Sequence, residues 1–598
     1  LHNQGDGLMT SRIDQIGQNG NDGLHYAEVE KEYGPTTPFA QEMHQMKYRS
    51  KGESFKEAQS RFAQALADDS HHFRATRDIL LNQRFMGGGR TQLAVGSPHQ
   101  TTAFNCFVSD TIHDSFDNIM DRAKQSGQTM RKGGGVGYDF SNIRPSGALI
   151  KSLGSNSSGP ISFMRIYDAL CKTVSSAGHR RGAQMGVLRV DHPDIEDFID
   201  AKKNKTELTA FNISIGITDK FMTAVREETN FDLVFEGKVY STIYAPSLWE
   251  KIMRATWDWA EPGVLYIDRI NEANNLWYCE TIAATNPCGE QPLPPNGACL
   301  LGSYNLTKYV DFDDAGTRSF NFAQLMLDIP VVVRAMDNIH DETIFPLPEQ
   351  AAESQAKRRM GLGVTGLANA IEALGFSYGS PKFLAVAEDI FRILRDETYK
   401  ASVMLAKEKG AFPMYDERLL DGEFIKTLPE AIREGIKKHG LRNSHLLSMA
   451  PTGTISITAD NISGGIEPAF SMGYERTVQH EDGPRFEQVE DYAYRVWGVT
   501  GKTADECTAD EHLAVLALAT RYVDSAVSKT VNVSPDMPWA DFKAIYMKAW
   551  EMKCKGITTF NVGGKRFGIL NATPKPKEYD GEAKACFIDL ATGQKECS

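Results

Sequence analysis

A thiol, a carboxylate and an amide alternate with two turn-forming residues in the stretch Asn286-Pro287-Cys288-Gly289-Glu290. In an extended segment alternate side chains point the same way, so Asn286, Cys288 and Glu290 can converge on one small substrate. Together they offer a sulfur reagent, a base and an orienting amide. The alternative is an ordinary loop with a buried cysteine, since free cysteine is among the most buried residue types. The pentapeptide alone leaves both interpretations open.

The bulk composition predicts a globular protein. The chain has 598 residues, of which 41% are hydrophobic and 24% charged, enough for several ordinary domains or one large barrel with insertions. Its formal net charge of −13 argues against a surface that coats nucleic acid, because such a surface needs basic residues. No run of about 18 apolar residues could span a bilayer, and the N-terminus shows no apolar signal core. We therefore expect a cytoplasmic protein without a nucleic-acid or membrane partner.

Nine cysteines are too few for a secreted disulfide scaffold in a chain of this length. They stand at positions 106, 171, 279, 288, 299, 507, 554, 586 and 597. Neither a C-x-x-C pair nor an H-E-x-x-H motif occurs, so no metal site is predicted. Beyond about Pro574 the composition predicts a mobile tail. Cys586 and Cys597 in this tail are predicted to be a shuttling thiol pair, because a flexible terminus is poor core material.

Hydrophobic periodicity predicts the elements that position these groups. One or two helices are expected between residues 54 and 82, and a helix capped by residues 114–117 is expected to run to about residue 128. Cys106 lies in the short apolar strand 104–108, where it could also be plain core. The same patterns predict strands at 210–217, 233–239 and 556–562, and helices at 161–174, 248–260, 539–552 and through most of 322–409.

Three glycine-containing segments are candidate anion sites. The turn 132–138 leads into a strand, with Arg144 and Lys151 close behind to offer positive charge to phosphate oxygens. The loop 178–186 combines cations with an amide, although a solvated basic turn is the alternative. Segment 451–456 stands between a predicted strand (446–450) and a predicted helix, and its small hydroxyl residues suit a phosphate cradle. An ordinary capped turn is the alternative there.

Residues 361–366 read Gly-Leu-Gly-Val-Thr-Gly and match the dinucleotide-binding fingerprint by spelling. The stretch before them, 355–359, is polar and helical, whereas the fingerprint requires a buried strand there. A nicotinamide site is therefore not predicted, and close helix packing is the preferred explanation of the glycines.

From about residue 85 to the tail, the chain resembles the catalytic subunit of ribonucleotide reductase. The resemblance rests on Asn-x-Cys-x-Glu at 286–290, Cys106 in its strand, Cys299 after the tip, Arg-Arg-Gly-Ala at 180–183, Pro-Thr-Gly-Thr at 451–454 and the terminal cysteines. It implies an α/β barrel of ten strands, in two antiparallel halves of five, with the Cys288 loop threaded through the middle. The implied segments are an N-terminal lead-in and helical region without an ATP cone (1–85), the barrel (86–573) and a flexible redox tail (574–598).

The resemblance implies a role for each residue of the tip. Cys288 matches the thiyl radical that removes the 3′ hydrogen of the ribose. Glu290 matches the base at the 3′ hydroxyl, and Asn286 its hydrogen-bonding partner. One carboxylate in a dry pocket can serve the proton transfers that such a reaction needs.

The other cysteines take redox roles by the same resemblance. Cys106 and Cys299 match the dithiol that reduces the 2′ position and becomes a disulfide. Cys586 and Cys597 would re-reduce that disulfide by thiol–disulfide exchange and would themselves be reduced by a thioredoxin- or glutaredoxin-like protein. Their spacing is wider than that of the close tail pair common in the family.

Substrate and effector residues are also implied. The substrate would contact Asn105, Pro451, Thr452, Gly453, Thr454, Ile455 and Ser456. A deoxyribonucleotide or ATP effector would contact Asp114 through its ribose, Arg144 and Lys151 through its phosphates, and Arg181 and Gln184 in the loop that relays effector identity. In the family these loops lie at a subunit interface, so a homodimer is implied.

Subclasses of the family differ in how the cysteine is oxidised. Class I proteins carry a tyrosine pair near the final strand, where this chain has Thr558-Thr559-Phe560-Asn561. Segments 555–559 and 158–164 look more like class II, which uses adenosylcobalamin, and residues 586–598 contain no glycyl-radical motif of class III. We therefore expect adenosylcobalamin-dependent reduction of ribonucleotides, with diphosphates favoured although no motif separates them from triphosphates. The alternatives are a class I large subunit that needs a metal-bearing partner and a non-catalytic nucleotide-binding regulator on the same fold.

Overall fold

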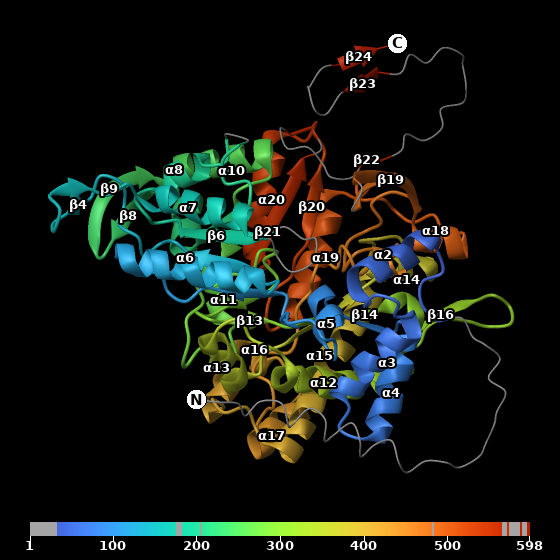
Figure 1. Cartoon of the computed structure of the whole chain (residues 1–598). Coiled ribbons are helices and arrows are strands. Elements are labelled where there is room, and N and C mark those ends of the chain that lie inside the picture. The colour runs from blue at the N-terminus through green and yellow to red at the C-terminus, as the bar shows by residue number, and fades with distance from the viewer. Residues whose placement is uncertain are drawn as a thin grey trace.

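The computed structural model describes residues 33–174, 182–203, 206–480 and 483–561, together with 563–564, 571–572, 586–588 and 595–597. The elements form a mixed α/β structure in which helices surround two groups of strands (Figure 1). Among the described helices, none has the length and apolar character needed to cross a lipid bilayer.

The largest sheet has eight strands. In order across the sheet they are β13 (Ala298–Cys299), β2 (Cys106–Val108), β3 (Gly135–Asp139), β6 (Gln184–Arg189), β7 (Phe211–Ile217), β10 (Gly263–Tyr266), β21 (Gly556–Asn561) and β20 (Thr530–Val533). The five strands from β2 to β10 are mutually parallel. At the two borders of this group the direction reverses, because β13 is antiparallel to β2 and β21 is antiparallel to β10.

The chain continues from both borders of the five parallel strands into a second group of strands. Its sheet contains β1 (Phe85–Gly87), β14 (Leu301–Asn305) and β17 (Gly361–Thr365), with β14 and β17 parallel. The predicted strand 446–450 is present only as two parallel bridges, Leu362 with Leu447 and Met449 with Val527. Val527 leads directly into β20, which is parallel to β21.

Two large hydrophobic cores lie on the outer sides of the strands. The first sheet is covered by α6 (Phe116–Arg131), α7 (Pro160–Thr173), α8 (Ile195–Asp200), α9 (Asp219–Arg226), α10 (Ala245–Trp259) and α20 (Trp539–Glu551). The second group packs with α3 (Phe55–Leu66), α4 (Ser70–Leu81), α12 (Phe322–Glu342), α14 (Leu367–Ala373), α15 (Pro381–Lys409), α16 (Glu423–Lys426) and α17 (Glu430–His439). Helix α19 (Ala509–Arg521) contributes to both cores. Figure 1 shows α6, α7, α8 and α10 on one side of the molecule and α12, α15 and α17 on another.

The remaining helices are α2 (Pro38–Tyr48), α5 (Gly89–Ala94), α11 (Ile267–Glu272), α13 (Pro348–Lys357) and α18 (Tyr492–Trp497), with the 3₁₀ turns η1 (Leu306–Tyr309), η2 (Glu417–Asp421) and η3 (Ile457–Ala459). The remaining strands form the pairs β4–β5 (Leu149–Ile150, Ser155–Asn156), β8–β9 (Asn230–Phe235, Lys238–Tyr244), β11–β12 (Ala284–Thr285, Pro292–Leu293), β15–β16 (Val310–Phe312, Arg318–Phe320) and β23–β24 (Cys586–Ile588, Lys595–Cys597). Strands β18 (Gly473–His480), β19 (Gly483–Glu490) and β22 (Asn571–Ala572) form a small sheet.

Local signals account for most helix boundaries. Ser54 and Glu57 form a reciprocal capping box at the start of α3. The Ser115 side chain accepts a hydrogen bond from the amide of Asn118, which begins α6 where the cap was predicted. The predicted helices at 54–82, 161–174, 248–260 and 539–552 are confirmed within a few residues.

Two predictions about glycine-containing segments are wrong. Gly361 and Gly363 do not serve helix packing, because they lie in the fully buried strand β17. A Cβ atom at Gly361 would overlap Gln291 Nε2 and Ser448 Oγ, so the close approach of these two side chains explains the glycine. Segment 451–456 does not lead into an α-helix either, since only the 3₁₀ turn η3 follows.

Candidate active site

The Asn286 to Glu290 stretch is the tip of a hairpin. Strands β11 and β12 pair antiparallel beneath it, and the Asn286 amide donates to the Gln291 carbonyl at 3.0 Å. The Gly289 amide donates to the Asn286 carbonyl at 3.0 Å, which closes a β-turn with Pro287 in its second position. The predicted extended conformation is therefore wrong: the side chains are brought together by a turn.

One side of this hairpin lies on the parallel strands. A Cβ atom at Gly137 in β3 would overlap the carbonyl oxygen of Thr285, so only glycine permits the two backbones to approach so closely. From β7, the Asn212 side chain donates to the Pro287 carbonyl at 2.9 Å. The turn is thus held at its base and at its tip by the first sheet.

The other side faces the second group of strands. The Ala526 amide donates to the Glu290 carbonyl at 2.9 Å, and Gln291 lies against Gly361 of β17. An interior apolar cluster joins the hairpin to both groups of strands. Its members are Val108, Met185, Val187, Leu265, Ile270, Ile282, Ala284, Leu293, Cys299, Leu301 and Ala450.

A buried lysine holds the segment that contacts Glu290. Lys555 donates to the carbonyls of Val523 and Asp524, each at 3.0 Å, and to that of Ser525. The Asp524 carboxylate accepts the amides of Leu446 and Leu447 at 2.7 and 2.9 Å. Burial lowers the pKa of Lys555 to about 8, and the nearby Asp524 charge opposes that shift. Several polar bonds therefore fix the backbone that leads to Ala526.

The three side chains of the tip differ in burial. Asn286 and Glu290 are buried, whereas Cys288 is exposed, which contradicts the alternative of an ordinary buried cysteine. Asn286 Oδ1 accepts the Gln291 amide at 3.0 Å, while its Nδ2 has no acceptor among the described residues. Apart from its chain neighbours, a Cβ atom at Gly289 would meet no atom within 4 Å, so this position of the turn is open.

Cys106 and Cys299 stand directly opposite each other in the antiparallel pair of β2 and β13. Facing residues of such a pair have Cα atoms about 4.5–5.5 Å apart, within the range that a disulfide spans. Burial raises the pKa of the Cys299 thiol well above its usual value, and the charges of Glu290, Cys106 and Cys288 add to the effect. Cys299 therefore stays protonated at neutral pH. A Cβ atom at Gly135 would lie 3.1 Å from Pro287 Cγ and 3.2 Å from Cys106 Sγ, so Cys106 lies beside the turn.

The predicted cradle residues form a turn whose backbone amides are available. Within the described ranges, the amides of Gly453, Thr454 and Ile455 donate to no backbone carbonyl, and a Cβ atom at Gly453 would meet open space. Thr452 has a positive φ of 52° and is held by its hydroxyl, which lies 2.9 Å from the Thr365 hydroxyl and accepts the Gly465 amide at 2.6 Å. Successive free amides in such a turn form an anion-binding concavity.

The predicted effector residues are only partly assembled. Asp114 and Arg144 form an ion pair at 2.6 Å, and Arg144 also donates to the Leu149 carbonyl in β4. Lys151 is exposed in the turn that follows. Gln184 is buried, and its amide bonds the Tyr138 hydroxyl and the Tyr167 carbonyl, so it presents no exposed atom to a ligand here. Arg181 lies outside the described residues.

The structure also describes Asn105 and part of the tail that holds Cys586 and Cys597. Asn105 is half-buried, and its Oδ1 receives no hydrogen bond from the part of the chain that the structure describes. In the tail, the backbones of β23 and β24 pair so that Cys586 faces Cys597. The described residues contain no group of three or more His, Cys, Asp or Glu side chains suited to a metal ion.

Sequence reasoning missed the residues that support the tip. Gln291, Asn212, Ala526 and Lys555 contact it or hold its supports, yet none belongs to a motif that predicts this. A lysine next to the apolar strand β21 was the only local signal, because a charged residue in such a place needs a partner.

Comparison with known proteins agrees with this geometry. Residues 104–560 match the family model described as "Ribonucleotide reductase, barrel domain". A vitamin B12-dependent ribonucleoside-diphosphate reductase of Mycobacterium tuberculosis is 36% identical over 83% of this chain and 73% of its own length. The protein of that name from Thermoplasma acidophilum is 34% identical over 85% and 68%, and the vitamin B12-dependent ribonucleotide reductase of Streptomyces clavuligerus is 28% identical over 90% and 64%. The chain belongs to the ribonucleotide reductase family.

The facing cysteines generate a first prediction. Mild oxidation of the native chain should join Cys106 to Cys299, because their positions across the ladder suit a disulfide. Peptide mapping by mass spectrometry without reduction measures the link. Cys171 and Cys554, buried in the outer core, serve as controls and should stay unlinked. Recovery of Cys106 and Cys299 as separate thiols after full oxidation would contradict the prediction.

The close approach at Gly137 generates a second. Gly137→Ala should lower the rate of ribonucleotide reduction about 100-fold, the effect of a displacement of about 1 Å at a reacting group. Gly216→Ala is the matched control, since a Cβ atom there, in β7, meets only ordinary contacts at 3.7 Å or more. Circular dichroism establishes that both variants fold. Equal rates for the two variants would show that the Gly137 contact does not position the tip.

Proposed function

We propose that this chain reduces ribonucleoside diphosphates to 2′-deoxyribonucleotides by a thiyl-radical mechanism that depends on adenosylcobalamin. The observation that carries the proposal is the exposed Cys288 at a rigid tip, beside buried Glu290 and the facing pair Cys106 and Cys299. The relatives from Mycobacterium tuberculosis and Thermoplasma acidophilum bear names that state this substrate class and this cofactor.

The space beside Cys288 and Gly289 suits the cofactor, because the thiol is exposed and no atom lies near the glycine position. Adenosylcobalamin, when bound, supplies the oxidising equivalent that removes the hydrogen atom of the Cys288 thiol. Strand β21 supports this choice over a class I transfer path, since Thr558, Thr559 and Phe560 offer no phenol there. We assign no individual residue to the cobalamin.

The proposed chemistry balances within the side chains of the site. Cys288 takes the 3′ hydrogen atom of the ribose, and Glu290 accepts the proton of the 3′ hydroxyl, while Asn286 orients the same group. A proton from one thiol of the Cys106 and Cys299 pair joins the 2′ hydroxyl, which leaves as water. The pair then delivers a hydrogen atom to C2′ and one electron to the sugar and becomes a disulfide, while Glu290 returns its proton to the 3′ oxygen. Cys288 finally returns its hydrogen atom to C3′. The raised pKa of Cys299 supports this role, because a protonated thiol retains its hydrogen.

The substrate phosphates would bind at the turn 451–456. Its three available amides and the hydroxyls of Thr454 and Ser456 supply donors without a lysine. Pro451 and Thr452 shape the turn, and Asn105 would contact the ribose side of the substrate through its buried Oδ1.

We also propose the ten-stranded barrel with Cys288 on a central finger. Support comes from the reversal of strand direction at both borders of the five parallel strands and from the two bridges that link β17, segment 447–449 and β20. The interior cluster that joins the hairpin to both groups supports the position of the finger. The proposed segments remain 1–85, 86–573 and 574–598. Because α3 and α4 share a core with α12 and α15, the first segment would be a layer on the barrel.

Regulation and partners complete the proposal. The ion pair of Asp114 and Arg144, with Lys151 and Arg181, would bind a deoxyribonucleotide or ATP effector, and Gln184 would relay its identity after leaving its present bonds. A homodimer would cover the exposed apolar side chains around α6, α7 and β4, which are Phe116, Leu149, Leu153 and Ile166. A cytoplasmic location suits reaction thiols that a thioredoxin- or glutaredoxin-like protein must keep reduced.

A turnover assay tests the function. The purified chain should convert CDP to dCDP with adenosylcobalamin and a small dithiol, and Cys288→Ser should abolish product while it retains CDP binding. High-performance liquid chromatography measures dCDP, and calorimetry measures binding. Product that requires an added metal-bearing subunit would favour the class I alternative. If the native chain binds CDP but forms no dCDP with any radical source, the non-catalytic regulator would be favoured.

The tail generates a separate prediction. With Cys586 and Cys597 both changed to serine, a single turnover should persist, while repeated turnover with a protein reductant should be lost, because the internal disulfide can no longer be reached. A small dithiol that diffuses into the site should restore repeated turnover. Full repeated turnover with the protein reductant alone would refute the shuttle.

A further inference from the structure

The 3₁₀ turn η3 and Asp460, which follow the 451–456 turn, are tied to the N-terminal part of the chain. Asp460, directly after η3, is almost fully buried at 2% exposure. Its carboxylate accepts the backbone amides of Thr36 and Thr37 at 2.8 and 2.9 Å. It also accepts both threonine hydroxyls, at 3.0 and 3.2 Å. Two residues more than 420 positions earlier in the sequence therefore donate all of these hydrogen bonds to one carboxylate.

These donors stand at the start of α2. Thr37 is the N-cap of this helix and accepts the Ala40 amide through its own hydroxyl at 3.2 Å. A carboxylate near the first amides of a helix is stabilised by the helix dipole and by otherwise unpaired N–H groups. Asp460 thus joins the start of α2 to the end of η3.

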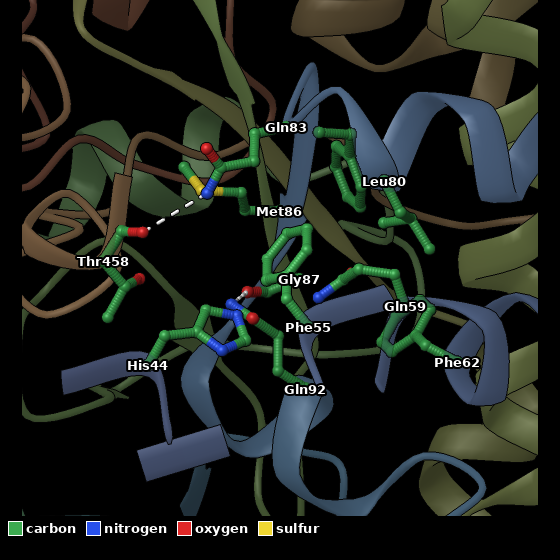
Figure 2. Close-up of a pocket in the computed structure, with 11 residues that line it drawn as sticks. His44, Phe55, Gln59, Phe62, Leu80, Gln83, Met86, Gly87, Gln92 and Thr458 are labelled. Carbon is green, nitrogen blue, oxygen red and sulfur yellow. Dashed lines mark hydrogen bonds between the residues drawn. The ribbon is translucent and has the colours of Figure 1, made fainter. Parts of the chain in front are cut away.

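Two further contacts join the same surfaces. Ile457 of η3 packs against Met43 of α2, with Phe39 and Met46 at the edge of the contact. The Gln83 side chain donates to the Thr458 carbonyl at 3.3 Å across a small pocket, as Figure 2 shows. Polar and apolar contacts therefore hold successive residues of η3 against the N-terminal layer.

Positive φ angles occur near the start of the 451–456 turn and directly after η3. Asp460 and Asn461 have positive φ angles of 65° and 60°, and Thr452 has one of 52°. A threonine in this region costs on the order of 1–3 kcal/mol and persists only where surrounding contacts hold it, whereas Asp and Asn adopt the region more readily. Thr452 is held from within the barrel by Thr365, whereas Asp460 is held by Thr36 and the amide of Thr37. The segment between them is anchored at each end by a different part of the chain.

We propose that residues 36–48 act as a clamp that sets the shape of the phosphate-binding turn, with Asp460 as the positioning residue through which the clamp acts. The inference rests on the proposed function of that turn and deepens it. The clamp contacts η3 and Asp460, which follow the turn, so it controls the affinity for the diphosphate group and leaves the chemistry at Cys288 unaltered.

Asp460→Asn tests the clamp. Asparagine tolerates a positive φ, so the variant keeps the backbone while it loses the charge and one acceptor oxygen. We expect about a 10-fold rise in the KM for CDP, with kcat within about twofold of the native value. The inhibition constant of inorganic pyrophosphate against CDP should rise by the same factor, because the effect is specific to phosphate.

Asp69→Asn is the matched control. Asp69 caps α4 by accepting the His72 amide at 2.7 Å, so the same substitution removes the same charge from a helix start away from the turn. Its KM should not change. If Asp460→Asn does not fold, Thr36→Val removes one hydroxyl bond to the same carboxylate and should raise the KM about threefold.

Failure of the clamp differs from failure of the proposed function. A native chain that binds CDP and pyrophosphate without forming dCDP would contradict the function, yet calorimetric dissociation constants for pyrophosphate would still test the clamp. Equal effects of Asp460→Asn and Asp69→Asn on KM, or a loss of thermal stability with an unchanged KM and pyrophosphate constant, would overturn the inference.

Discussion

The site depends on the burial of one small hairpin between two groups of strands. A pair of two-residue strands has no stability of its own, so β11 and β12 keep their shape only because both sides are covered. Gly137 permits contact on one side, and the Ala526 amide supplies the bond on the other. The side chains of the tip are therefore positioned by residues far from them in the sequence.

Buried charge stabilises the second side of this arrangement. An ammonium group inside a protein is tolerated only when polar groups surround it, and Lys555 satisfies this condition with three consecutive carbonyls. Those carbonyls belong to the segment whose next amide, that of Ala526, binds the Glu290 carbonyl. The charge of Lys555 thus acts on the hairpin through the backbone of residues 523–526.

Local patterns predicted what local interactions determine. Caps and apolar periodicity located α3, α4 and α6, and the apolar strand around Cys106 was found as β2. The strand at Gly361 was missed because the glycine there is required by the close approach of Gln291 and Ser448, which lie elsewhere in the sequence. The turn at Cys288 was mistaken for an extended segment although its local signals, Pro287 and Gly289, were present in the sequence. The sequence predicted which residues carry chemical groups at the site, but it did not predict which residues hold them in place.

The two ends of the proposed substrate belong to different parts of the fold. The facing thiols stand at the border where β13 meets β2, and the turn 451–456, proposed to bind phosphate, begins directly after Ala450 in the second group of strands. Ala450 packs in the same interior cluster as Cys299 and Leu293 of the hairpin. A ribose between the turn and the thiols would therefore lie at the tip of the hairpin. Because both groups of strands contact that hairpin, a shift of either group would move the Cys288 thiol relative to the ribose of a bound substrate.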